Sequence, residues 1–109
     1  MKRKPTVFNL KHEHKHICGD PNVVYIGRES PRLGLKRSKW HNPYHVCAFR
    51  IREEACWLYR EYLLYHKELL DRLPELEGKR LGCYCKPELC HGDILVELFM
   101  QRVYEPIRR

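Results

Sequence analysis

Apolar residues recur with helical spacing between residues 49 and 73, which makes this segment the clearest predicted element of the chain. The recurring positions follow the 3, 4, 7 spacing of one helix face: Ile51, Ala55, Leu58, Tyr59, Tyr62, Leu63, Leu69, Leu70 and Leu73. Charged residues fill the opposite face, and Pro74 follows directly. Because the residue before a proline is pushed away from helical angles, we expect the helix to end there.

Three shorter segments have the composition of strands. Residues 22–27 are rich in β-branched and aromatic side chains between turn residues, so they are predicted to form a buried strand. Residues 79–85 are predicted to form a second buried strand, and residues 6–10 alternate weakly, as a short strand does. A last apolar segment predicts a helix that begins near His91 and ends before Pro106.

The order of these elements predicts a small single α/β domain over the whole chain, with residues 1–5 and 105–109 as loose ends. A helix between two strands favours a parallel β-α-β pair, here flanked by the long helix and the C-terminal helix. Ligands of such sheets bind beyond the carboxyl ends of the strands. The loop over residues 28–44, which shows no periodicity, and the segment around Cys90 and His91 are therefore expected to meet at one edge.

Composition narrows the class of protein. An apolar fraction of 43% in 109 residues is too rich for disorder and is enough for one modest core. No apolar run reaches the roughly 18–20 residues that span a bilayer, and the basic N-terminus lacks the apolar stretch of a signal peptide. We therefore expect a cytoplasmic protein that keeps its six cysteines as thiols, with Cys47 and Cys56 in the core.

Charge points to an anionic partner, because a formal net charge of +7 favours contact with the phosphates of a nucleotide or a nucleic acid. Cations and aromatic rings alternate around the rigid Asn42-Pro43 turn, an arrangement that suits base stacking and phosphate contacts. The predicted ligand-binding residues are Arg28, Lys39, Trp40, His41 and Asn42. The plainer alternative is an ordinary basic protein with a loop whose aromatic rings pack on the long helix.

Cys83, Cys85, Cys90 and His91 have the residue types of a zinc site. The spacing raises a difficulty, since residues two apart in a strand place their Cβ atoms roughly 6.5–7 Å apart, farther than a tetrahedral zinc ion tolerates. The strand must end or bend there for all four to bind one ion. In the alternative interpretation, Cys83 and Cys85 pack under a helix while only Cys90 and His91 are presented.

Cys90, His91 and Asp93 are predicted as catalytic residues because they lie at the start of the last helix. A helix N-terminus stabilises a thiolate, and its unpaired N–H groups attract anions. His91 can hydrogen-bond a phosphate or act as a base, and Asp93 suits the positive end of the helix dipole. Alternatively, the cysteine and histidine are only a cap and a core contact.

His12, His14 and His16 alternate and are followed by Cys18, so one strand face would present all four as metal ligands. The alternative is a solvated, lysine-rich loop without a metal.

Three blocks of the sequence resemble the domain-of-unknown-function family DUF4326. They are Val-Tyr-Ile-Gly-Arg at residues 24–28, Lys-Trp-His-Asn-Pro-Tyr at 39–44, and residues 76–93, which end in Cys-His-Gly-Asp. The resemblance implies a small bacterial or phage protein without a settled activity. It adds Pro43 to the motif set, and it departs at His41, where the family pattern has glycine.

These features support a leading hypothesis and two alternatives. The leading one is a domain that binds or acts on a nucleotide or nucleic acid at the strand ends. The second is a zinc-stabilised, non-catalytic protein that binds a host protein or nucleic acid. The third is nucleic-acid binding through charge alone, which predicts affinity that falls steeply with salt.

Overall fold

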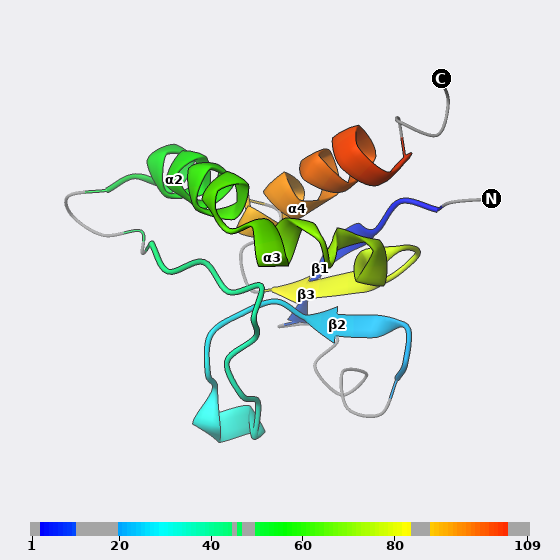
Figure 1. Ribbon diagram of the computed structural model, residues 1–109. Helices are drawn as coiled ribbons and strands as arrows, with labels where there is room; N and C mark the ends of the chain where they lie inside the picture. The colour runs from blue at the N-terminus through cyan, green and yellow to red at the C-terminus, as the bar shows by residue number, and fades with distance from the viewer. Residues whose placement is uncertain (1–2, 11–19, 45, 47–49, 84–87, 105–109) are drawn as a thin grey trace.

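Three parallel strands form the sheet at the centre of the molecule (Figure 1). The computed structural model describes residues 3–10, 20–44, 46, 50–83 and 88–104. Strands β1 (Thr6–Asn9), β2 (Val23–Tyr25) and β3 (Arg80–Cys83) lie in the order β1-β3-β2. Both outer strands run parallel to β3, as predicted for the pair that a helix connects.

Strand β2 differs from its prediction, because it is an edge strand and only half-buried. It covers three residues rather than the six over residues 22–27, and all three side chains are partly exposed. The fully buried side chain of the segment is Ile26, directly after the strand. An edge strand has a neighbour on one side only, so an apolar composition alone does not make it a central, covered strand.

The long helix predicted over residues 49–73 is divided into shorter elements. Helix α2 covers Arg52–Tyr65, α3 covers Lys67–Leu70, and a 3-10 helix, η3, covers Leu73–Leu76. The division falls at His66, whose backbone is not helical and whose Nδ1 lies 2.7 Å from the carbonyl oxygen of Tyr62. Pro74 therefore lies at the start of η3 instead of ending a continuous helix.

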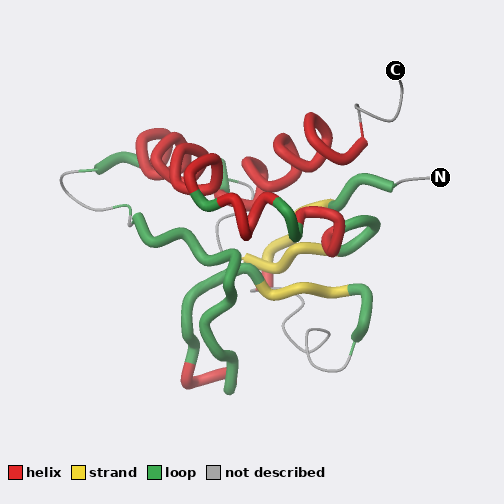
Figure 2. The backbone as a smooth tube through the Cα atoms, viewed as in Figure 1, coloured by secondary structure: helices red, strands yellow, loops and turns green. Residues whose placement is uncertain are grey.

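The C-terminal helix α4 covers His91–Phe99 and continues into a π-helical turn over Met100–Tyr104, as the apolar pattern predicted. Figures 1 and 2 show α2 and α4 on the same side of the sheet. The core fills the space between this helical layer and the sheet. Its buried side chains include Leu81 from the sheet, Tyr59 and Leu63 from α2, and Leu95, Leu98 and Phe99 from α4.

Residues 26–44, which follow β2, are mostly irregular, as the lack of periodicity over residues 28–44 predicted. They contain a 3-10 turn, η2, over Pro31–Leu33, closed by an antiparallel bridge between Ser30 and Leu35. Gly34 ends the turn with a φ of 68°, a conformation that favours glycine. The backbone N–H of Ser38 donates to the carbonyl of Gly27 (3.0 Å), so the segment returns to the end of β2.

The start of the described chain is tied to the body of the protein. The N–H of Gly78 donates to the carbonyl of Arg3 (2.8 Å), and Pro5 is fully buried. Within the described residues, no helix combines the length and the apolar character needed to cross a membrane.

Candidate ligand-binding site

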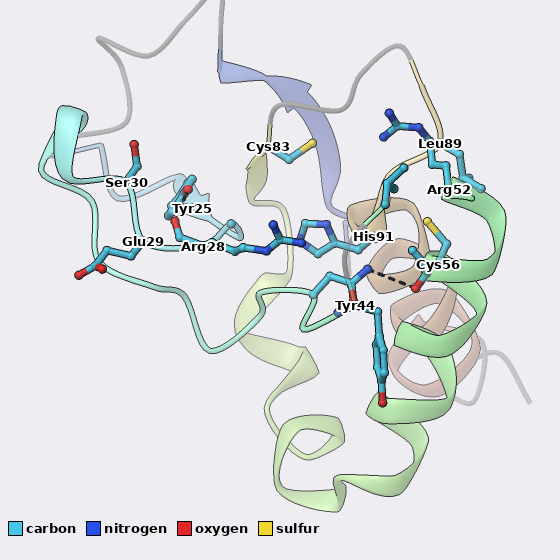
Figure 3. A pocket seen from close by; sticks show the side chains of 14 residues that line it. Tyr25, Arg28, Glu29, Ser30, Tyr44, Arg52, Cys56, Cys83, Leu89 and His91 are labelled. Carbon is cyan, nitrogen blue, oxygen red and sulfur yellow. Dashed lines mark hydrogen bonds between the residues drawn. The ribbon is translucent and has the colours of Figure 1, made fainter. Parts of the chain in front are cut away.

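A cavity of about 490 Å³ opens beyond the carboxyl ends of β2 and β3, at the sheet edge that the topology indicated. Residues after β2 form one side, the first turns of α2 form the opposite side, and the start of α4 contributes to the floor (Figure 3). The lining side chains that carry polar or reactive groups are Tyr25, Arg28, Glu29, Ser30, Asn42, Tyr44, Arg52, Cys56, Cys83 and His91.

Two arginines line the cavity. Arg28 follows β2, and its side chain extends towards His91 (Figure 3). Arg52 is the first residue of α2 and lies on the other side of the cavity from Glu29 and Ser30. Among the described residues, the ion pairs of the protein involve Lys39, Arg60 and Arg72, and neither cavity arginine forms one. Their guanidinium groups therefore keep their hydrogen-bond donors for a ligand.

His91 is buried at the floor of the cavity, and the contacts of its ring fix its orientation. Its Nε2 lies 2.6 Å from the carbonyl oxygen of Ile26, which only accepts, so Nε2 carries a proton. The Nδ1 atom lies 3.7 Å from the Sγ of Cys90, and the ring meets that of Tyr59 edge to face at 5.1 Å. In a neutral imidazole, the remaining acceptor thus faces Cys90.

Cys90 and Asp93 form a capping box at the start of α4. The backbone N–H of Cys90 donates to the Asp93 carboxylate (2.9 Å), while the Sγ of Cys90 accepts from the N–H of Gly92 (3.3 Å). The N–H of Asp93 donates to the carbonyl of Cys90 (2.9 Å). The N–H groups of Gly92 and Asp93, which were predicted to be available to an anion, therefore donate to Cys90 instead. Neither Cys90 nor Asp93 lines the cavity, so His91 is the predicted catalytic residue that reaches it.

Gly92 allows α4 to begin directly against the sheet. A Cβ atom at this position would lie 2.8 Å from the Cδ1 of Ile26 and 3.0 Å from a methyl group of Val7. These distances are shorter than ordinary contacts, so a larger residue would require the side chains of Ile26 and Val7, or the start of α4, to shift.

The structure places Trp40 in the core rather than in the cavity. Its side chain is 2% exposed, and the hydroxyl of Tyr59 donates to its carbonyl (2.6 Å). Base stacking requires an accessible ring face. Trp40 therefore fits the alternative in which the aromatic rings of this loop pack against the protein. Lys39 forms an ion pair with Glu75 (2.6 Å), and the Nδ1 of His41 contacts the carbonyl of Ser38 (2.8 Å). None of these three side chains lines the cavity.

Asn42 lines the cavity, but its amide connects two parts of the wall. Its Nδ2 donates to the carbonyl of Ala55 in α2 (3.2 Å), and its Oδ1 accepts from the N–H of Tyr44 (2.9 Å). The side chain thus holds the loop against α2. His41, in the position where the family pattern has glycine, is unstrained, because within the described chain only glycines have positive φ.

Burial raises the pKa of Tyr59 well above its ordinary value of 10.0, with smaller contributions from Tyr62 and Cys90. Tyr59 therefore remains a hydrogen-bond donor to Trp40 and supports the wall behind His91.

The thiols of Cys83 and Cys90 lie in contact, with their Sγ atoms 2.8 Å apart. Tetrahedral zinc with bonds of about 2.3 Å holds two sulfurs about 3.8 Å apart. Among the described residues, no group of three or more His, Cys, Asp or Glu side chains has the arrangement to hold a metal ion. Cys85, the fourth member of the predicted zinc set, lies outside the described residues, as do His12, His14, His16, Cys18 and Cys47. Cys56 is buried on α2, in line with its prediction.

Sequence reasoning missed Arg52 and Glu29 as cavity residues. Arg52 resembles any charged residue on the solvent face of an amphipathic helix, and its role depends on the helix beginning at the strand ends. The order of the elements gave a weak signal. A helix that follows the loop after β2 begins near the edge of the sheet where the strands end.

Comparison with known proteins places these features in a family. The model of the family described as "Domain of unknown function (DUF4326)" matches residues 8–101. A protein of Enterobacteria phage T4, named "Uncharacterized 12.4 kDa protein in nrdA-td intergenic region", is 58% identical over 26 residues. That match spans 24% of each chain, well under the full length of the relative. No solved structure matches the chain.

Proposed function

We propose that this chain, which belongs to the DUF4326 family of domains of unknown function, binds a phosphate-containing ligand in the cavity at its strand ends. The observation that carries the proposal is the pair of arginines, Arg28 and Arg52, on the walls of one cavity without ion-pair partners among the described residues. The ligand is a nucleotide, free or as part of a nucleic acid.

Arginine is well suited to phosphate. Its planar guanidinium presents paired N–H donors that match two phosphate oxygens, and such charge-assisted bonds are stronger than neutral ones. Glu29 supplies the one carboxylate among the lining residues, so the described wall carries more positive than negative charge. The formal net charge of +7 adds a general attraction for anions.

The size and the remaining lining favour a nucleotide over a bare phosphate ion. A volume of about 490 Å³ lies in the range of about 300–1,000 Å³ that is common for small-molecule sites. Ala55, Cys56 and Leu89 offer an apolar surface for a base or a sugar, and Glu29 and Ser30 offer acceptors for ribose hydroxyls or base N–H groups. A phosphate ion alone would leave most of this lining unused.

The geometry supports binding more directly than a reaction. The Nε2 of His91 is committed to Ile26, and its Nδ1 faces Cys90, so the ring presents no free acceptor to a ligand in its neutral form. His91 therefore shapes the floor of the site in this proposal. A cytoplasmic location, where nucleotides are plentiful, is consistent with it.

Substitution of the two arginines tests the proposal. We expect R28A and R52A each to weaken the binding of a ribonucleoside monophosphate at least tenfold, because a charged hydrogen bond contributes about 1.5–3 kcal/mol. Isothermal titration calorimetry at fixed ionic strength measures the change.

R37A is the matched control, because it removes the same charge from an exposed position that does not line the cavity. Equal losses in all three variants would show attraction by net charge alone and would contradict a built site. Unchanged affinity in R28A and R52A would reject the proposal as well.

A further inference from the structure

We infer that Cys83 and Cys90 form a redox-active dithiol that closes to a disulfide at the floor of the cavity. Their Sγ atoms are 2.8 Å apart, and a disulfide bond measures about 2.05 Å. Each sulfur therefore has to move by only about 0.4 Å for the bond to form. This inference concerns the thiols alone and does not depend on which ligand the cavity binds.

Both cysteines belong to regular structure. Cys83 ends β3 and pairs with Asn9 of β1 in the sheet. Cys90 is the N-cap of α4, and Asp93 fixes its backbone. The approach of the two sulfurs thus follows from the position of α4 against β3.

The contacts of Cys90 hold its sulfur in place beside Cys83. The N–H of Gly92 donates to its Sγ (3.3 Å) at the positive end of the α4 dipole, and Nδ1 of His91 lies 3.7 Å away. The Sγ of Cys90 donates to the Sγ of Cys83 (2.8 Å). A thiolate at Cys90 attacks a disulfide on Cys83 without leaving its position.

Access to the pair is asymmetric, and this orders the steps. Both side chains are buried, with Cys90 0% and Cys83 2% exposed, and of the two only Cys83 lines the cavity. We assign the first attack to the Cys83 thiolate, which breaks the S–S bond of a small disulfide such as oxidised glutathione and releases one glutathione thiol. The Cys90 thiolate then attacks the Cys83 sulfur and releases the second. The protein gives up two electrons and two protons, and the two glutathione thiols receive them.

Peptide mapping of the full-length protein after incubation with oxidised glutathione tests this order. We expect the wild type to lose two of its six thiols and to yield a Cys83–Cys90 link. In C90S the resolving thiol is missing, so Cys83 should accumulate as a mixed disulfide with glutathione. In C83S the buried Cys90 should stay reduced.

C56S is the matched control, because Cys56 is also buried and also lines the cavity. It should form the link at the wild-type rate. The wild-type mapping needs no substitution, so it remains decisive if a variant fails to fold, which circular dichroism reports.

Three results would overturn the inference. One is a link between other cysteines, and another is full retention of all thiols in the wild type. The third is one tightly bound zinc ion per chain in protein purified without added metal, with thiols that react only after chelation.

Discussion

Cys90 occupies the N-cap of α4, a position where serine, threonine, asparagine and aspartate are the usual residues. Its sulfur accepts a hydrogen bond from the N–H of Gly92, and the Asp93 carboxylate accepts one from the backbone N–H of Cys90. From sequence, a cysteine, a histidine and an aspartate at a helix start suggest catalysis. The spacing of Cys90 and Asp93 is also that of a capping box with the hydroxyl replaced by a thiol, which is the signal that identifies their structural role.

At this residue scale, D93A should destabilise the protein by about 0.5–2 kcal/mol, because the Cys90 N–H loses its acceptor. Urea unfolding followed by circular dichroism measures the free energy of unfolding. D71A is the control, since Asp71 is an exposed carboxylate at the end of α3 whose side chain has no hydrogen bond or ion pair among the described residues. Equal stability of D93A and D71A would show that the capping box contributes little.

At the scale of elements, the apolar pattern predicted which segments are helices and strands better than where each begins and ends. Residues 49–73 keep helical periodicity across His66, because α3 continues to present Leu69 to the same core as α2. At the break the ring of His66 contacts Tyr62, and no periodicity reveals these contacts. Strand β2 likewise has the composition of a buried strand, and its edge position follows only from the order β1-β3-β2.

The 3-10 helix η3 is joined to the loop before α2 by Glu75, which pairs with Lys39 (2.6 Å) and with Arg72 (2.9 Å). Hydrogen bonds from Lys39 and then Arg72 lower the pKa of Glu75 below its ordinary value of 4.5. The folded state therefore binds this proton less readily than the unfolded state. The stabilisation of the folded state by the ionised Glu75 is present above pH 4.5. It is lost as the pH falls through the lower pKa that Glu75 has in the folded state.

We expect E75Q to lower the free energy of unfolding by about 0.2–1 kcal/mol near neutral pH, a small effect because solvent screens this exposed pair. The difference from the wild type should shrink as the pH falls below 4.5 and vanish below the lowered pKa of Glu75 in the folded state. Urea unfolding over a pH series measures this difference. The control is E61Q, because Glu61 is an exposed residue of α2. A difference that persists unchanged in acid would rule out the ion pairs as its cause.

At the scale of the whole molecule, the predicted topology located the cavity, but composition did not identify all of its walls. Parallel strands bring Arg28 and the start of α4 to one edge, and this much follows from the order of elements. Trp40 was a reasonable candidate for stacking because cations surround it, yet its size and apolar character place it in the core. Arg52 enters the site because the long helix begins at that same edge.

In our proposal, the cavity between Arg28, Arg52 and His91 holds a phosphate-bearing ligand. Titration of isotopically labelled protein with each of the four common ribonucleoside monophosphates, followed by amide chemical shifts, tests it most directly. We predict saturable shifts concentrated at residues 27–30, 52–56 and 91–92 for at least one nucleotide. Shifts confined to the basic residues 32–39, or no saturable shift with any of the four, would contradict the claim.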